Sequence, residues 1–375
     1  MERKPDSNSG VGFGIKSSTD IPGEIGLGWL RFTCPAVAYQ SIVDFIKRFF
    51  KVDLFDRRKG WNGYLMSWQG SYSIMVGLTP ILTVEQRESM GIRRSPNEGY
   101  MTVEIPQSAL DTLSLSCHWE MWLEMMAIDG LKIKRVDVFY DDFNRELMPL
   151  QLKQLVESRQ VSVPRVRDLK CYEKFDLLER KNCGSTVYFG SAKSEKQVRF
   201  YDKFAESGGK KKCNRLEVQL VNGKAAAMQE WLLAAMAASL DCTSAERCAG
   251  EVVKAYRECI VGSIDFLDTS NFDPGESLPS NWAGRCNRIV WWKKIVTNIN
   301  KANLSVSRVK PSLSDKVDWL KSQVFTSLSL VREVYRNWQI PWNCWITSEL
   351  DSAESRWSDR HWKLFQEALV TSPAV

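Results

Sequence analysis

Histidine is scarce in this 375-residue chain, which contains only His118 and His361, in separate segments that we expect to be helical. Two histidines so far apart exclude a metal site built on a histidine pair, so any metal ion must bind mainly to oxygen ligands. His118 stands in Ser116-Cys117-His118-Trp119 and is better explained as a structural residue than as a ligand.

The ten cysteines include no Cys-x-x-Cys pair, which argues against a zinc site and fits reduced thiols in a cytoplasm. Residues 1–20 lack the apolar segment of a signal peptide. The most apolar stretch, 225–240, is interrupted by Gln229 and Glu230 and is too short to span a bilayer. We therefore expect a soluble, cytoplasmic protein without a membrane partner.

The formal net charge of +6 is compatible with a nucleic-acid partner but does not require one. The cations are also clustered locally, since Lys210, Lys211 and Lys212 follow two glycines. A solvated loop is the ordinary meaning of such a cluster. DNA contact becomes the better interpretation if a catalytic site lies alongside it.

The order of strand-like and helical patterns predicts an α+β fold with a mainly antiparallel sheet, helices packed on one side of it, and a helical C-terminal region. We expect a disordered tail over 1–20, a nicking region of two strand-helix halves over 21–282 with its core motifs at 133–220, and the helical region over 283–375. Expected strands include 29–33, 63–68, 73–78, 100–105, 133–141, 186–190, 197–201 and 215–220, and expected helices include 107–126, 146–160, 223–240 and 245–262.

Three of these strands alternate apolar and polar residues, so each has one core face and one polar face. If the strands are neighbours in one sheet, their polar side chains gather on one surface. That surface would carry Arg135 and Asp137, then Arg199 and Tyr201, then Arg215, Glu217 and Gln219.

This mixture of side chains suits phosphoryl transfer. The carboxylates of Asp137 and Glu217 suit a hard cation, Mg²⁺ or Mn²⁺, which can polarise a phosphate. Arginines stabilise the charge of the transition state, and Tyr201 can act as a nucleophile. The alternative is a set of cross-strand ion pairs on a solvated sheet face, with a tyrosine that only packs.

The block Thr186–Ser191, Gln197–Lys203 and Arg215–Leu220 resembles the replication initiation factor (Rep_trans) family, rolling-circle initiators of plasmids and filamentous phages. Upstream, Arg135-Val136-Asp137 with Asp141 is similar to the acidic signature of that family. The segment 312–320 is similar to one in phage-type members. The resemblance covers roughly residues 28–335.

The resemblance implies that Tyr201 attacks a phosphodiester at the origin, keeps the 5′ end as phosphotyrosine and releases a 3′-OH primer. It assigns Asp137, Glu217 and Asp141 to the divalent metal, with Asp142 as an alternative to Asp141. Arg199 and Lys203 would flank the scissile phosphate. Many members carry an acidic residue where this chain has Gln219, so the metal affinity or the choice of metal can differ.

For DNA binding we expect contributions from Lys210, Lys211, Lys212, Arg215 and Arg135. The partner implied is origin DNA, single-stranded or melted at the nick site. The family role also allows for a host helicase, a host polymerase and a second copy of the chain as partners. Tyr188 and Tyr140 are candidates for a second nucleophile by proximity alone.

Three other classes of protein share parts of this pattern. A tyrosine recombinase needs a histidine near its second arginine, and a restriction-type nuclease needs Glu-x-Lys, which Glu217-Val218-Gln219 lacks. The strongest alternative is a non-catalytic DNA-binding replication regulator of the same fold. The joint presence of Tyr201, Asp137 and Glu217 argues against it.

Overall fold

The computed structural model describes residues 23–92, 95–178, 180–237, 245–273, 282–297, 301–302, 304, 317, 320–358, 361–362 and 365–366. The chain forms two compact units, residues 1–306 and 307–375. The expected tail 1–20 and most of the segment 312–320 lie outside the described residues.

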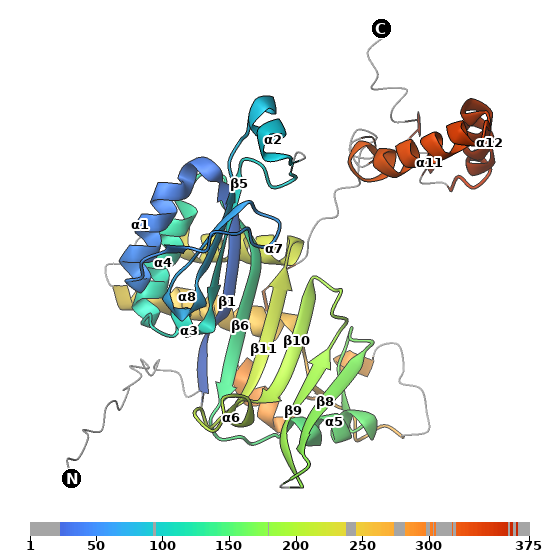
Figure 1. The fold of residues 1–375 in the computed structure, drawn as a ribbon. Coiled ribbons are helices and arrows are strands. Elements are labelled where there is room, and N and C mark those ends of the chain that lie inside the picture. The colour runs from blue at the N-terminus through green and yellow to red at the C-terminus, as the bar shows by residue number, and fades with distance from the viewer. Residues whose placement is uncertain are drawn as a thin grey trace. The chain divides into compact units, whose positions relative to one another are not determined.

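A ten-stranded antiparallel sheet forms the centre of the first unit (Figure 1). Its strand order is β2-β3-β4-β5-β1-β6-β11-β10-β9-β8, which places β1 and β6 in the middle. The strands are β1 (Gly23–Pro35), β2 (Phe55–Asp56), β3 (Met66–Gln69), β4 (Met75–Thr79), β5 (Tyr100–Pro106), β6 (Lys132–Asp142), β8 (Leu169–Asp176), β9 (Lys181–Phe189), β10 (Lys196–Asp202) and β11 (Asn214–Val221). Two further short strands, β7 (Val161–Ser162) and β12 (Leu267–Asp268), pair with each other.

Helices cover one face of this sheet, behind it in the view of Figure 1. The contacts that hold them there run from α7 and α8 to the central strands, from α4 to α8, and from α5 to β9. The helices of this unit are α1 (Tyr39–Phe50), α2 (Val84–Met90), α3 (Gln107–Leu110), α4 (Leu115–Met126), α5 (Pro149–Glu157), α6 (Lys203–Glu206), α7 (Gly223–Ala237), α8 (Ala245–Ser263) and α9 (Val290–Val296). The predicted α+β class with helices on one side is confirmed.

The core lies between the sheet and these helices because alternate strand residues turn toward them. Val136 and Val138 of β6, with Leu216 and Val218 of β11, are buried there. Trp292 of α9 packs on Phe266 in the same core, with ring centroids 5.3 Å apart. The polar residues between these apolar positions therefore point to the opposite face of the sheet.

Two irregularities in the pairing of β1 with β6 shape that opposite face. Leu27 pairs with Val138 and Trp29 with Asp137, so Gly28 is an extra residue in β1. Arg31 pairs with Arg135 and Phe32 with Ile133, so Lys134 is an extra residue in β6. A β-bulge places two successive residues on one side of the strand. Each strand thus presents one more residue to this face than regular alternation allows.

The helix expected over 107–126 is interrupted in the structure. It ends as α3 at Leu110 and restarts as α4 at Leu115, where the Ser114 side chain accepts a hydrogen bond from the backbone N–H of Cys117. A serine at this position satisfies an otherwise unpaired helical N–H group and favours a new start. The strand β8 was not among the expected strands.

The second unit contains α11 (Phe325–Asn337) and α12 (Trp342–Glu354), preceded by a π-helical turn over Leu320–Val324. Tyr335 lies among three indole rings, which it contacts at centroid distances of 5.0 to 6.2 Å: Trp338, Trp342 and Trp345. Within the described part of the chain, no helix is both long enough and apolar enough to cross a membrane.

Candidate active site

Two carboxylates and a guanidinium meet on the face of the sheet that is turned away from the helices. Asp137 lies on β6 and Glu217 on the adjacent β11, and Arg199 of β10 pairs directly across from Glu217. The Arg199 Nη2 atom donates to Asp137 Oδ2 at 2.9 Å and to Glu217 Oε1 at 2.6 Å. The condition that the sequence pattern set is met, since the three strands are neighbours in the order β6-β11-β10.

Tyr201 stands beside this triad. Its hydroxyl group donates to Glu217 Oε2 at 2.8 Å, and only 8% of the residue is exposed. Burial, followed by the negative charge of Glu217, raises the pKa of the phenol well above its usual range. Tyr201 is therefore a neutral phenol whose proton already points at a carboxylate. We refer to Asp137, Glu217, Arg199 and Tyr201 as the tyrosine site.

Asp137 is held by two arginines. Arg135 binds it with two hydrogen bonds, Nε to Oδ1 at 2.8 Å and Nη2 to Oδ2 at 2.6 Å, in addition to the contact from Arg199. Burial raises the pKa of Asp137 to about 6 although Arg135 opposes the shift. Arg135 itself lies 4.8 Å over the ring of Trp29, a residue that the sequence pattern had not singled out.

One polar atom of the tyrosine site lacks a partner. The Arg199 Nε atom is buried and makes no hydrogen bond within the described structure. Gly28 leaves space nearby, because a Cβ atom there would lie 3.3 Å from Glu217 Oε1 and 3.7 Å from Asp137 Cβ. A buried N–H group without an acceptor is costly, and a phosphate oxygen is a suitable acceptor for it.

Asp141 lies further along β6 and has other partners. Arg215 binds it with Nε to Oδ1 at 2.6 Å and Nη2 to Oδ2 at 2.7 Å, and Lys211 reaches Oδ2 at 2.7 Å. Burial alone would raise the pKa of Asp141, but the hydrogen bonds and charge of Arg215, with the charge of Lys211, lower it. We refer to Asp141, Arg215 and Lys211 as the closed cluster.

The expected DNA-binding cations fall into two groups. Arg215 is fully buried, with Nη1 donating to Gln107 Oε1 at 2.6 Å, and Lys211 is turned inward to Asp141 and Glu24. The structure therefore does not place Arg215 on an accessible surface. Lys210 and Lys212 are exposed in the loop after α6.

Lys203 and Gln219 frame the tyrosine site. The Lys203 Nζ atom lies 5.8 Å from the centroid of the Tyr201 ring and pairs with Glu206 at 2.7 Å. Gln219 pairs directly across from Asp137, so the amide stands at the position where a third carboxylate would adjoin the first. Within the described residues, no three acidic, cysteine or histidine side chains group closely enough to hold a metal ion.

The other residues that the sequence suggested as metal ligands or second nucleophiles lie on different faces of the sheet. Asp142 accepts a hydrogen bond from Trp291 Nε1 at 3.1 Å on the helix side, and Tyr140 is buried there as well. Tyr188 pairs across from Arg199 and so shares the face of the tyrosine site. His118 is buried in the helix layer beside Tyr256, remote from these carboxylates in the fold.

The family model for "Replication initiation factor" matches residues 131–340, more than half of the chain. This chain belongs to the replication initiation factor family. The match begins just before β6 and therefore includes the tyrosine site and the closed cluster.

Among solved structures, the fold is similar to that of a rolling circle replication initiator protein from Geobacillus stearothermophilus. The two share 16% sequence identity with a TM-score of 0.52, over 76% of this chain and 99% of the other. At that identity the likeness is one of fold. None of the curated proteins matches the chain in sequence.

Proposed function

We propose that this chain initiates rolling-circle replication by nicking one strand of origin DNA with Tyr201 as the nucleophile. The observation that carries the proposal is the hydrogen bond from the Tyr201 hydroxyl to Glu217, beside a buried Arg199 N–H group that lacks an acceptor. Membership of the replication initiation factor family supports it. The similarity in fold to a rolling circle replication initiator protein supports the rolling-circle mode.

The proposed reaction is an exchange of one phosphate ester for another. The Tyr201 oxygen attacks the phosphorus as Glu217 Oε2 takes the phenolic proton. The two oxygen atoms between which this proton moves are 2.8 Å apart. The bond from phosphorus to the 3′ oxygen breaks, and that oxygen takes a proton from solvent and leaves as a 3′-OH primer, while Glu217 later releases its proton to solvent. The 5′ phosphate stays on Tyr201. A base within hydrogen-bonding distance is needed because the pKa of the phenol is raised.

Arg199 is suited to hold the phosphate during this exchange. Its free Nε atom is the buried donor in the tyrosine site, and Nη2 already anchors the guanidinium to both carboxylates. A guanidinium fixed in this way binds phosphate oxygens without losing further side-chain freedom. The Lys203 ammonium, 5.8 Å from the centroid of the Tyr201 ring, is a second positive charge beside the nucleophile, although Glu206 pairs with it.

Asp137 and Glu217 fit a divalent cation, Mg²⁺ or Mn²⁺, because both are carboxylates and Gly28 leaves space beside them. Mg²⁺ commonly binds one or two carboxylates and keeps several waters. When bound, such an ion would neutralise phosphate charge. Arg199 at both carboxylates and Arg135 at Asp137 would then have to release the oxygens that bind the ion. Asp141 is left out because both of its oxygens are held by the fully buried Arg215.

A covalent trapping experiment tests the proposal. The protein is incubated with a labelled library of single-stranded oligonucleotides and Mn²⁺, then denatured, and we expect a labelled adduct on Tyr201. Tyr201→Phe should bind DNA yet form no adduct, whereas Tyr72→Phe, at an exposed tyrosine in a short 3-10 turn, should behave as wild type. An adduct that persists in Tyr201→Phe would remove Tyr201 from this role.

The alternative function is a replication regulator of the same fold that binds DNA without cutting it. The burial of Tyr201 and the contact of Arg199 with both carboxylates favour it, since a site closed in this way must open before it reacts. DNA binding without any adduct, in both wild type and Tyr201→Phe, would support this function instead.

A further inference from the structure

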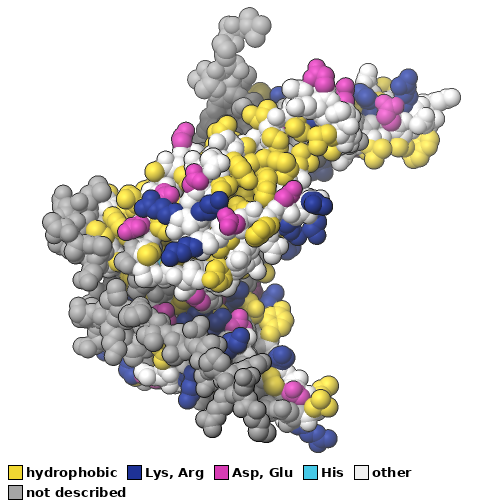
Figure 2. Space-filling view, turned by 60° about the vertical axis from the view of Figure 1, so that its left-hand side comes forward, with side chains coloured by type: hydrophobic (Ala, Val, Ile, Leu, Met, Phe, Trp, Pro, Cys, Tyr) yellow, Lys and Arg dark blue, Asp and Glu magenta, His cyan; other side chains and the backbone are white. Residues whose placement is uncertain are grey.

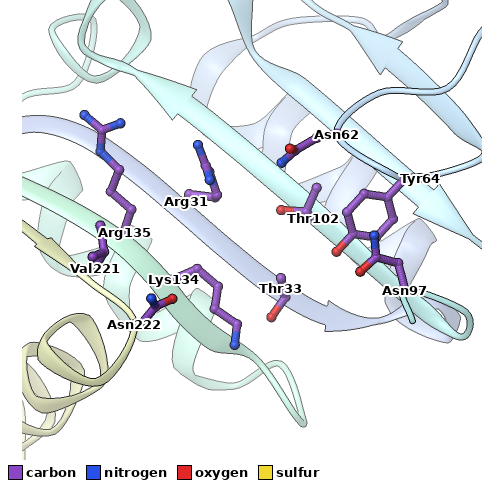
Figure 3. A pocket seen from close by; sticks show the side chains of 10 residues that line it. All are labelled: Arg31, Thr33, Asn62, Tyr64, Asn97, Thr102, Lys134, Arg135, Val221 and Asn222. Atoms are coloured by element: carbon purple, nitrogen blue, oxygen red, sulfur yellow. The ribbon is translucent and has the colours of Figure 1, made fainter. Parts of the chain in front are cut away.

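A second feature lies on the same sheet face, next to the tyrosine site. It is a pocket of about 450 Å³ over β5, β1 and β6, which we call the basic groove (Figure 3). Its lining residues are Arg31, Thr33, Asn62, Tyr64, Asn97, Thr102, Lys134, Arg135, Val221 and Asn222. None of them is acidic, whereas three are cations.

The two bulges in β1 and β6 explain why cations gather here. The extra residue Lys134 and its neighbour Arg135 both turn to this face, opposite Arg31 of β1. The charge of Arg31 is partly cancelled by Glu104 at 2.7 Å, and that of Arg135 by Asp137. Lys134 forms no ion pair with any described residue, so its charge is the one available to a ligand.

Hydrogen bonds hold the wall of the groove opposite Lys134 in a defined conformation. The turn that carries Asn62 is closed by a bridge between Trp61 and Tyr64, and the Asn97 side chain donates to Gly63 O at 3.1 Å. Tyr64 is buried beneath this turn. Figure 3 shows the three cations on one side of the groove and Asn62, Tyr64 and Asn97 on the other.

The chemistry of this lining suits a phosphate backbone. Lysine and arginine with asparagine, threonine and tyrosine are the side chains that contact phosphates and sugars in DNA complexes. A site for a free small molecule is usually lined mainly by apolar groups, and here only Val221 is aliphatic. Net charge alone does not mark a DNA-binding surface on the face shown in Figure 2, where Lys and Arg side chains are interspersed with Asp and Glu.

The groove adjoins the tyrosine site through Arg135, which lines the groove and also binds Asp137. Strand β6 is separated from the Tyr201 strand, β10, by β11 alone. Tyr201 is level with Arg215 and Asp141 across the sheet, so Lys134 lies seven residues further along β6. Two strand spacings sideways and seven residues along the strand amount to roughly 25 Å. A DNA strand whose phosphate lies at Tyr201 would therefore need several nucleotides to reach Lys134.

We propose that the basic groove binds the phosphate backbone of the single-stranded DNA that flanks the nick, with Lys134 as its main contact. This inference rests on the proposed function, because that function brings a single strand to the neighbouring site. Lys134 is here a binding residue and takes no part in the chemistry. The shared ligand chemistry is a phosphodiester or phosphate, and the experiment separates DNA from free nucleotides.

The experiment measures how DNA affinity depends on salt. Tyr201→Phe protein, which cannot form the adduct, is titrated onto a fluorescein-labelled, mixed-sequence 30-nucleotide single strand at 0.05 to 0.2 M KCl. Removing one phosphate contact to a single strand makes the slope of log K against log salt less steep by about 0.7. We expect that change in Lys134→Ala. The factor by which Lys134→Ala binds the strand more weakly than the parent protein should therefore fall roughly threefold between the lowest and the highest salt concentration.

Two matched variants control the measurement. Lys134→Arg should keep the wild-type slope, and so should Lys254→Ala, which removes an exposed lysine from α8 in the helix layer. A slope in Lys134→Ala equal to that of Lys254→Ala would overturn the proposal. So would a loss of binding to ATP or inorganic phosphate without any change for DNA.

Failure of the groove and failure of the proposed function give different results. If wild-type protein forms the Tyr201 adduct and the Lys134→Ala slope is unchanged, the nicking function stands and the groove does not bind the strand. If no adduct forms and the slope changes as expected, the groove binds single-stranded DNA and the nicking function fails.

Discussion

Two charged clusters share one face of the sheet and differ in how completely their hydrogen bonds are satisfied. In the closed cluster, Asp141 and Arg215 are fully buried and joined by two bonds, and Gln107 and Lys211 supply further contacts. In the tyrosine site, Arg199 Nε has no acceptor among the described residues, and Glu217 accepts a hydrogen bond from the Tyr201 hydroxyl group. The nitrogen atoms of Arg215 are all bonded within the closed cluster, whereas the tyrosine site holds a donor that a ligand can satisfy.

The pKa values of the two aspartates show the same difference. Burial raises the pKa of Asp137 to about 6, whereas the bonds from Arg215 outweigh burial and lower the pKa of Asp141. Two carboxylates on one strand thus have opposite shifts. An unusually basic carboxylate beside a nucleophile is typical of a site for ligands or catalysis, while a fully paired one is typical of a structural contact.

The largest expected effect is on nicking. Glu217→Gln keeps the shape of the side chain but removes the proton acceptor for Tyr201 and one proposed metal ligand. We expect the rate of nicking of supercoiled origin plasmid to fall by about 10²–10⁴-fold. The measurement is the initial rate in Mn²⁺, with circular dichroism to check that the variant stays folded. Normal nicking by Glu217→Gln would contradict the role of Glu217.

The next effect is on the free energy of unfolding, and here the closed cluster should matter more than the tyrosine site. Arg215→Ala leaves the Asp141 carboxylate buried without its main partner, and we expect a loss of about 3–5 kcal/mol in the free energy of unfolding. Arg199→Ala leaves Asp137 bound to Arg135 and Glu217 bound to Tyr201, so it should cost less, about 1–2 kcal/mol. Urea unfolding of both variants tests this difference. Equal losses would mean that the tyrosine site also contributes to stability as a closed pair.

The smallest effect is on the pH dependence of unfolding, measured in EDTA. Because the folded pKa of Asp137 is raised from 3.8 to about 6, the folded state holds the extra proton between these values, and stability falls as pH rises through them. Asp137→Asn should remove a slope of up to about 1.4 kcal/mol per pH unit in that window. Asp141 has a lowered pKa, so the stability that its ionised carboxylate contributes is lost only as pH falls below 3.8.

The matched variant Asp141→Asn completes that measurement. It should leave the slope between pH 4 and 6 as in wild type and lower stability throughout that range. If Asp137→Asn and Asp141→Asn gave the same slopes, the opposite pKa shifts of the two aspartates would be wrong.

Strand periodicity predicted much of the site, because alternation alone places Asp137, Arg199, Tyr201 and Glu217 on one face. It could not separate Asp141 from them, since Asp141 has the same parity on β6. What distinguishes Asp141 is its bond with Arg215, and Arg215 is held in turn by Gln107 of α3. Gln107 is distant in sequence from both, so the pairing depends on tertiary packing.

The basic groove was also beyond a strand-by-strand prediction. Regular alternation would send Lys134 to the core side, where Val136 and Val138 lie. The bulge that redirects Lys134 is visible only in the pairing of β6 with β1. The predicted role of Arg135 in DNA contact stays a prediction, although Arg135 lines the groove.

The two bulges also constrain how the lengths of these strands can change during evolution. The extra residue in β1, Gly28, and the extra residue in β6, Lys134, compensate each other, so β1 still pairs regularly with β5 and β6 with β11. Deleting only one of them would shift part of that strand by a single position. Side chains that now lie in the core, such as Ile25 and Leu27 of β1 or Tyr140 and Val138 opposite them on β6, would then turn to the other face of the sheet. We therefore expect insertions and deletions at these two places to occur together among related chains.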